Sequence, residues 1–217
     1  MYELPLFPLN LVLFPGMPLT LHIFEERYKV MIGRCLKQEL PFGVVLIREG
    51  KEVGGKATPH TVGCTARIAH TQPLEAGKMN LVAVGEHRFQ VVSLHEEEPY
   101  LSGMVETLPP VSGALRAKDR RLAFLNGLVR RYMQAMAEIS ESISSGDMPD
   151  KPLELVYLAA ALLQIPMPGK QLLLEIDQSE ELLSTMVEHY RYETPLMEWL
   201  RVHRPNDLDE PGSFSLN

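Results

Sequence analysis

The hydrophobic pattern of this chain changes its period near residue 110, and this change constrains the fold more than any other feature. Before Pro109-Pro110, short apolar runs are separated by turn residues, which is typical of strands. After Ser112-Gly113, apolar residues recur at three- and four-residue steps, which is typical of helices. The pattern therefore predicts an α+β fold, with a β-rich domain over residues 1–110 and a helical domain over residues 114–203.

The first part carries one helical pattern among its strands. Leu19 and Leu21 alternate with polar residues, which predicts a half-buried strand. Residues Phe24–Lys37 place apolar side chains on one helical face, and Gly85–His87 predicts a hairpin connection. One helix inserted in a β domain predicts an open or semi-closed barrel, with the helix over one end. The remaining strands are expected at Val12–Phe14, Phe42–Ile47, Val62–Ile68, Asn80–Val84, Arg88–Leu94 and Leu101–Leu108.

The helical pattern of the second part is divided by proline and glycine. Asp177, with Glu180 three residues later, predicts the start of the last long helix. Pro195 is expected to end that helix, with Thr194 as the N-cap of a short one that runs through Trp199. Residues 204–217 contain two prolines, a glycine and three acidic residues, which predicts a disordered tail. The earlier helices are expected at Leu115–Ser142, Pro152–Leu163 and Gly169–Leu174.

The charge balance excludes some partners. The chain has 21 basic and 28 acidic residues and a formal net charge of −7, which opposes binding to nucleic acids and to anionic membranes. The apolar stretch Leu155–Leu163 is too short to span a bilayer, and the N-terminus lacks the pattern of a signal peptide. Cys35 and Cys64 lack metal-site spacing, so we expect reduced, buried thiols in a cytoplasmic protein. The basic residues of one predicted helix are interpreted as a solvated face: Arg116, Lys118, Arg120, Arg121, Arg130 and Arg131.

Two motifs come close to known sites without matching them. Gly50–Lys56 fits the phosphate-binding pattern G-x-x-x-x-G-K, but Ala57 stands where a hydroxyl should hold magnesium, and a strand pattern follows. We interpret it as a polar hairpin loop. His95–Glu98 is interpreted as a solvated turn, because consecutive residues point in different directions. The chain has no G-x-S-x-G or H-E-x-x-H motif. We therefore expect no catalysis, cofactor or metal, although a Ser–Lys or Cys–His site assembled from distant positions stays open.

The opening segment carries the most specific family signal. Leu4–Gly16, with the sequence LPLFPLNLVLFPG, runs into Leu19–Tyr28, with the sequence LTLHIFEERY. Together with later segments, these residues resemble the N-terminal domain of the Lon protease family, in the form found as stand-alone proteins. The resemblance extends to about residue 203. The later matching segments are Phe42–Ile47, Val62–Ile68, Gly85–Phe89, Pro99–Leu101, Lys170–Glu175 and Glu180–Leu183.

The resemblance implies both a fold and a function. It implies a PUA-like β pseudo-barrel with one inserted helix, followed by a C-terminal helical bundle, and a role in recognising unfolded or degradation-prone polypeptides. In full-length Lon the ATPase and the Ser–Lys protease lie downstream, so this chain is expected neither to hydrolyse ATP nor to cut peptide bonds. The alternative is a small-molecule-binding module that uses the mouth of the pseudo-barrel. Expected partners are polypeptides or proteins, with weak self-association.

Exposed apolar surface on the β domain is the expected binding surface. Met17, beside a turn, is the strongest candidate, because its side chain adapts to different partners. Phe14 and Phe24 are more often core residues in such positions. The candidates are Leu11, Val12, Phe14, Met17 and Phe24 around the Pro15-Gly16 turn, and Tyr100, Met104 and Tyr132 facing a groove between the two domains.

Overall fold

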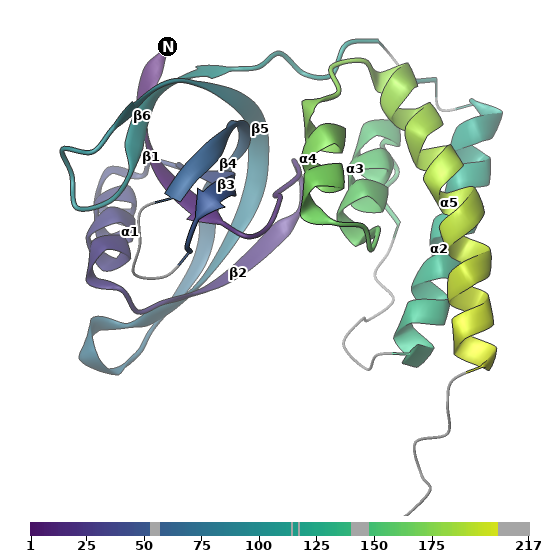
Figure 1. Ribbon diagram of the computed structural model, residues 1–217, viewed down its shortest axis with the longest axis horizontal. Helices are drawn as coiled ribbons and strands as arrows, with labels where there is room; N and C mark the ends of the chain where they lie inside the picture. The colour runs from purple at the N-terminus through teal and green to yellow at the C-terminus, as the bar shows by residue number, and fades with distance from the viewer. Residues whose placement is uncertain (53–56, 114, 117, 140–147, 204–217) are drawn as a thin grey trace, which may run out of the picture.

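A mixed sheet and a group of helices follow one another along the chain and lie side by side (Figure 1). The computed structural model describes residues 1–52, 57–113, 115–116, 118–139 and 148–203. We call residues 2–107 the β region and residues 120–202 the helical region. The predicted α+β class is confirmed. The predictions for residues 53–56, for the helix break at 144–147 and for the tail at 204–217 lie outside the described residues.

The elements follow the predicted order with one correction: the first strand is Tyr2–Leu9, and no strand forms at the expected Val12–Phe14, whose side chains pack into the apolar clusters instead. The strands are β1 (Tyr2–Leu9), β2 (Pro18–Ile23), β3 (Phe42–Gly50), β4 (Ala57–Pro73), β5 (Met79–His95) and β6 (Ser102–Thr107). The helices are α1 (Glu26–Gln38), α2 (Arg120–Ile139), α3 (Pro152–Leu162), α4 (Met167–Glu175) and α5 (Ser179–Val202), and a 3-10 turn, Glu75–Gly77, joins β4 to β5.

The sheet closes on itself where β6 pairs with β5. Its order is β2-β5-β4-β3-β1-β6, and β6 also pairs with β5, so that β5, β4, β3, β1 and β6 form a ring. β1 and β3 are parallel, whereas the other described pairs are antiparallel. β2 lies outside the ring and pairs with β5 alone among the described strands.

Gly85–His87 lies inside β5 and does not form the predicted hairpin connection. Gly85 pairs with Ala66 of β4, so the strand continues through this point. A Cβ atom on Gly85 would lie 2.4 Å from the carbonyl oxygen of Phe14. Glycine is therefore required here because the Phe14 backbone lies too close for a side chain, and not because the chain turns.

Helix α1 packs over one end of the ring with its predicted apolar face. Tyr28, Met31, Ile32 and Cys35 are buried, and the Tyr28 ring stacks on Phe7 with 3.9 Å between centroids. Phe24 was expected in this core, and that prediction was wrong. The helix begins only at Glu26, and the Phe24 side chain, which precedes it, is exposed.

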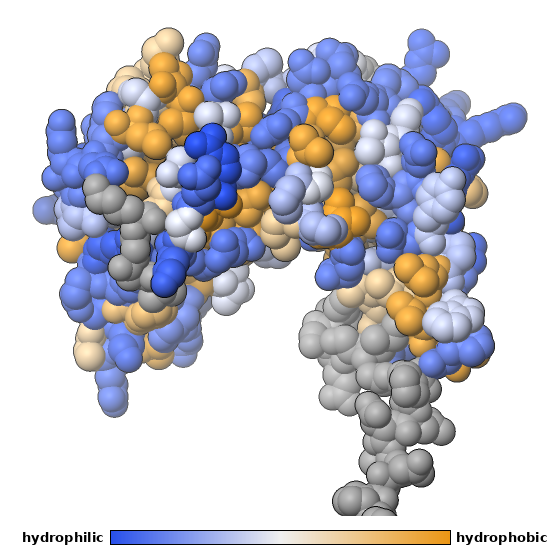
Figure 2. Space-filling view, in the orientation of Figure 1, coloured by the Kyte–Doolittle hydropathy of each residue, from blue (hydrophilic) through white to orange (hydrophobic). Residues whose placement is uncertain are grey.

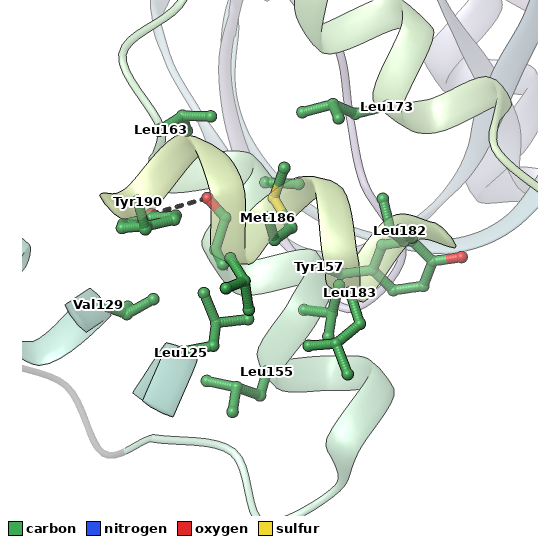
Figure 3. Packing of buried hydrophobic residues seen from close by; sticks show 14 of the residues in the cluster. Leu125, Val129, Leu155, Tyr157, Leu163, Leu173, Leu182, Leu183, Met186 and Tyr190 are labelled. Carbon is green, nitrogen blue, oxygen red and sulfur yellow. Dashed lines mark hydrogen bonds between the residues drawn. The ribbon is translucent and has the colours of Figure 1, made fainter. Parts of the chain in front are cut away.

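The described part of the helical region contains four helices, of which α2 and α5 pack against each other and α3 and α4 lie on the side of the β region (Figure 1). Helix α2 begins at Arg120 and not at Leu115, because the Asp119 carboxylate accepts the Arg121 backbone N–H at 2.8 Å and caps the helix there. Figure 3 shows the apolar side chains of these helices, together with Leu163 after α3, converging on one interior.

Two predictions for α5 were wrong. Pro195 does not end the helix, which continues to Val202. The turns beyond Pro195 are held against α2 by ion pairs from Glu198 to Arg131 and from Arg201 to Glu138. Asp177 is not the N-cap, because the helix begins at Ser179 and Gln178 holds the N-cap position. The Asp177 carbonyl oxygen accepts the Ser112 N–H at 2.7 Å and ties the connector to the chain that leaves the β region.

The largest apolar cluster belongs to both regions. It holds the buried residues of α2 to α5 together with Phe14 and Val62 of the β region. The Phe14 ring lies 6.2 Å from that of Tyr157 on α3. Two further clusters lie within the β region, one under α1 and one inside the ring around Phe89.

A buried arginine completes the junction between the regions. Arg88 of β5 is 4% exposed and donates hydrogen bonds to the carbonyl oxygens of Leu174, Ile176 and Pro109, at 2.9, 2.6 and 3.3 Å. The first two lie at the C-terminal end of α4, where a positive charge complements the helix dipole. Arg88 thus binds the α4–α5 connector and the chain between the regions at once.

Candidate functional site

Strand β2 lies between two of the accessible candidate residues, Met17 and Phe24. Met17 precedes the strand and is half-buried, and Phe24 follows it and is 45% exposed. The six residues of the strand lie between them, so seven residue steps place them about 23 Å apart. Figure 2 shows the molecule hollowed beneath the junction of its two regions, and β2 forms the margin of the β region beside this hollow (Figure 1).

The turn before β2 positions Met17. Gly16 has a φ of 81°, which favours glycine, and its N–H donates to the carbonyl oxygen of Gly85 at 2.8 Å. Met17 then packs against both the shared cluster and the cluster under α1. Leu11 and Val12, also half-buried, pack against one cluster each. The segment before β2 therefore bridges two cores and leaves part of its apolar surface accessible.

A ladder of polar side chains crosses the outer face of β2, β5 and β4. His22 Nδ1 and Asn80 Oδ1 are 2.9 Å apart, and the Asn80 amide donates to Gln72 at 3.3 Å. The His22 ring also stacks on Phe24, with 5.9 Å between centroids. These contacts orient Phe24 at the end of β2.

Three of the predicted binding residues are buried and cannot form an open surface. Phe14 and Tyr132 have no exposed surface, and Tyr100 is 3% exposed. Phe14 fills the shared cluster, and the Tyr132 ring packs edge-on against Tyr190 at 5.1 Å. The Tyr100 hydroxyl accepts a hydrogen bond from Arg34 of α1 at 2.9 Å.

The predicted groove between the regions does not bring its three residues together. Tyr100 lies in the cluster under α1, Tyr132 lies in the shared cluster, and Met104 is half-buried in β6 between β1 and β5. A pocket of about 120 Å³ does lie at the junction, but other residues line it, among them Arg88 and Tyr157. The groove residues therefore do not form one site.

The pockets and buried thiols offer little for small-molecule binding or catalysis. A pocket of about 220 Å³ beside α1 is lined by charges of both signs, from Arg27, Lys51, Glu96 and Glu98. It is smaller than the roughly 300–1,000 Å³ of most ligand sites. The predicted burial of Cys35 and Cys64 is confirmed, and this burial raises their pKa values to about 11 and about 12, which keeps both thiols protonated near neutral pH.

The two near-miss motifs occupy ordinary positions. Gly50 ends β3 and pairs with Ala57 at the start of β4, so the described ends of the first motif lie on adjacent antiparallel strands. His95 ends β5, and Glu98 forms an ion pair with Arg34 at 3.0 Å. Within the described ranges, no three His, Cys, Asp or Glu side chains gather as metal ligands, and no helix there could span a membrane.

Known proteins match this arrangement over most of the chain. Residues 3–190 match the family described as the ATP-dependent protease La (LON) substrate-binding domain. The chain belongs to the Lon substrate-binding domain family. It is 30% identical over 189 residues to the Lon protease of Anaeromyxobacter dehalogenans and 30% identical over 176 residues to Lon protease 2 of Myxococcus xanthus. These alignments cover 85% and 79% of this chain but 22% and 21% of the relatives, so the chain spans about a fifth of their length.

Solved structures of the Lon family have the same fold. The Lon N-terminal domain protein from Xanthomonas campestris superposes with a TM-score of 0.67 at 25% identity, over 87% of this chain and 98% of that one. The N-terminal domain of the Mycobacterium avium complex Lon protease superposes with a TM-score of 0.60 at 15% identity, over 88% and 99% of the two chains. The predicted resemblance to Lon is therefore confirmed.

The sequence contains one residue that indicates the edge position of β2. Its alternation predicted a half-buried strand, but the position of that strand at the margin of the sheet was missed. Pro18, at its first residue, was the available signal, because proline within sheets is confined to edge strands, first positions and bulges.

Proposed function

We propose that this chain binds unfolded or degradation-prone polypeptides without changing them chemically. The observation that carries the proposal is the match of residues 3–190 to a substrate-binding domain of a protease, because the substrates of a protease are polypeptides. The match involves the substrate-binding part of Lon and not its ATPase or peptidase, which supports a non-catalytic role.

The binding surface that we propose combines Leu11, Met17 and Phe24. Accessible apolar side chains on a folded surface attract the apolar residues that an unfolded chain exposes. Methionine adapts its shape to different partners, and the exposed Phe24 ring supplies a larger contact area. Both properties suit a surface that must accept many sequences.

The finer features of the fold and its setting are also proposals. The ring closed by β5 and β6 supports a PUA-like pseudo-barrel, and the packing of α2 to α5 supports a helical bundle as a second domain. The two free, buried thiols support a reducing, cytoplasmic location. We propose protein partners and weak self-association, and the net charge of −7 argues against nucleic acids and anionic membranes.

Fluorescence anisotropy with a labelled, permanently unfolded polypeptide tests the proposal. We would titrate reduced, carboxymethylated α-lactalbumin with the protein and run the same samples, with ATP and magnesium, on a gel. Saturable binding with an intact polypeptide is expected. Absence of binding up to high micromolar protein contradicts general unfolded-chain recognition, and cleavage contradicts the non-catalytic role.

A matched pair of variants tests the proposed surface. Phe24 and Phe124 are 45% and 46% exposed, but Phe24 adjoins β2, whereas Phe124 lies on α2 beside Arg191. We expect Phe24→Ser to weaken binding by about fivefold to tenfold and Phe124→Ser to leave it unchanged. Equal effects of the two substitutions would place the binding surface elsewhere.

A further inference from the structure

We propose that the free edge of β2 binds an extended segment of the unfolded polypeptide as an additional strand. This inference rests on the proposed function and specifies how the partner is held. The edge consists of the backbone N–H and C=O groups of Thr20 and His22, flanked by Met17 and Phe24.

The ladder between β2 and β5 determines which backbone groups are free. The Gly85 N–H donates to the Met17 carbonyl oxygen at 2.9 Å, so Met17 lies at a bonded position. In an antiparallel ladder every second residue repeats this direction, so Leu19, Leu21 and Ile23 direct their backbone groups toward β5. Thr20 and His22 direct theirs away from it, to the side on which no described strand pairs with β2.

The chemistry of these groups specifies the occupant. A row of alternating donors and acceptors at strand spacing is complementary to the backbone of another extended chain. Such hydrogen bonds do not depend on the partner's side chains. A site of this kind can therefore accept many sequences, as a substrate-binding domain of a protease must.

β2 carries one of the features that usually protect an edge, the proline at its first residue, and lacks the others. Natural edge strands are blunted by charged side chains, by proline or by bulges. The six residues of β2 carry no Asp, Glu, Lys or Arg, and Pro18 affects only its first position. Both side chains at the free positions, Thr20 and His22, are exposed.

A free edge on β4 shows the contrast. β4 continues beyond Ala66, where its pairing with β3 begins, and residues 67–73 pair with β5 alone. That edge carries the exposed Arg67, a register irregularity between Ile68 and His70, and Pro73 at its end. Among the described strands, β2 is the one that pairs on a single side along its whole length.

The ends of β2 add selectivity for apolar segments. An added strand of about eight residues would reach from Met17 to Phe24, because each residue advances about 3.3 Å. The Phe24 ring, stacked on His22, offers an apolar surface at one end. The expected partner is an extended, uncharged segment with an apolar or aromatic side chain that meets Phe24.

Thr20→Pro removes one free donor while leaving the ladder to β5 in place. Proline has no N–H, and its ring obstructs an incoming strand at that position. We expect Thr20→Pro to weaken the binding of carboxymethylated α-lactalbumin by about tenfold. Thr20→Val, which keeps the N–H and the side-chain shape, is the matched control and should bind as the wild type does. Equal affinities of the three proteins would overturn the proposal.

Amide hydrogen exchange of the wild type gives a second test that does not depend on the folding of a variant. In the free protein, the amides of Leu19, Leu21 and Ile23 should be protected and those of Thr20 and His22 should exchange rapidly. Saturation with the unfolded polypeptide should protect Thr20 and His22. Binding without this protection would refute strand addition at β2 but not the proposed function. Absence of binding would refute both.

Discussion

The two regions of the molecule are held together by different interactions. In the β region, hydrogen-bonded ladders link the strands into a ring, and two apolar clusters lie wholly within it. In the helical region, the backbone hydrogen bonds run within each helix except at its ends, so the helices are joined mainly through side chains. Their cluster includes Phe14 and Val62, which belong to the β region.

This asymmetry indicates that the helical region depends on the β region more than the reverse. Phe14 packs against α3, Arg88 binds the connector after α4, and the Gln171 amide donates to the Val62 carbonyl oxygen at 3.0 Å. The change in hydrophobic pattern near residue 110 therefore marks a change of secondary structure, but the apolar packing continues across it.

Phe14→Ala tests this dependence with the largest expected effect. Removing a fully buried ring costs about 3–5 kcal/mol, through lost burial and a residual cavity. Because the ring fills the shared cluster, hydrogen exchange should accelerate in α3 and α5. Phe42→Ala, in the cluster under α1, should cost a similar amount but accelerate exchange first in the β region. Identical exchange patterns would show that the regions are not asymmetric.

Arg88→Met should have the next largest effect. The substitution keeps an apolar stem but leaves the carbonyl oxygens of Leu174, Ile176 and Pro109 without this donor. We expect the free energy of unfolding to fall by about 3 kcal/mol in guanidinium titrations. Arg88→Lys retains the charge and should recover part of the loss. An unchanged midpoint for Arg88→Met would mean that water replaces the arginine at no cost.

Alkaline pH should destabilise the β region before the helical region, because ionisation of the buried thiols affects only the β region. Both cysteines lie in the β region, where burial raises their pKa values from about 9 to about 11 for Cys35 and about 12 for Cys64. A raised folded-state pKa gives stability that is complete below the unfolded pKa and is lost as the pH rises toward the folded value. At pH 10, each thiol should therefore lower the free energy of unfolding by about 1.4 kcal/mol relative to its value at neutral pH.

The expected measurement is a pair of stability–pH profiles in the presence of reductant. Wild-type stability should fall between about pH 8.5 and pH 10, with the earliest loss of exchange protection in the β region. The Cys35→Ala, Cys64→Ala double variant should give a flatter profile over the same range. Parallel profiles for the two proteins would contradict the assignment to the thiols, because the buried tyrosines of the helical region titrate only above their ordinary pKa near 10.

The sequence predicted elements well where one local pattern decides the structure. The alternation at Leu19 and Leu21, the apolar face of α1 from Tyr28 onward, and the apolar α3 all lie where expected. It failed where a distant contact overrides a local signal. Gly85 predicted a turn, but the structure needs a glycine there because the Phe14 backbone approaches closely. Pro195 predicted the end of a helix, but an ion pair to α2 holds the following turns in helical conformation.

The candidate site was predictable in part for the same reason. Met17 and Phe24 lie at accessible positions, but Phe14 and Tyr132 have the same apolar character and are buried by helices far away in the sequence. Hydrophobicity alone does not separate a binding residue from a core residue. The open edge of β2 depends on which strands are neighbours in space, and composition does not encode that order.

The smallest expected effect is the loss of one exposed ion pair, and it can be compared between the two regions. Arg131 and Glu198 join α2 to α5 at 2.6 Å, and Arg67 and Glu86 join β4 to β5 at 2.7 Å. These pairs are exposed to solvent, so Glu198→Gln should lower Tm by less than about 2 °C. Glu86→Gln should lower it less, because the ladder between β4 and β5 already holds those strands together. A larger effect at Glu86 would reverse the comparison between the regions.

Salt and acid provide the controls for this last comparison. The hydrogen bond from Arg131 holds the pKa of Glu198 below its ordinary value. A lowered folded-state pKa gives stability that is present above the unfolded pKa and is lost as the pH falls through the folded value. The difference between wild type and Glu198→Gln should therefore vanish in strongly acidic buffer, and also in about 1 M salt, where exposed charges are screened. A difference that survives both conditions would mean that Glu198 stabilises α5 by packing against α2 rather than by its charge.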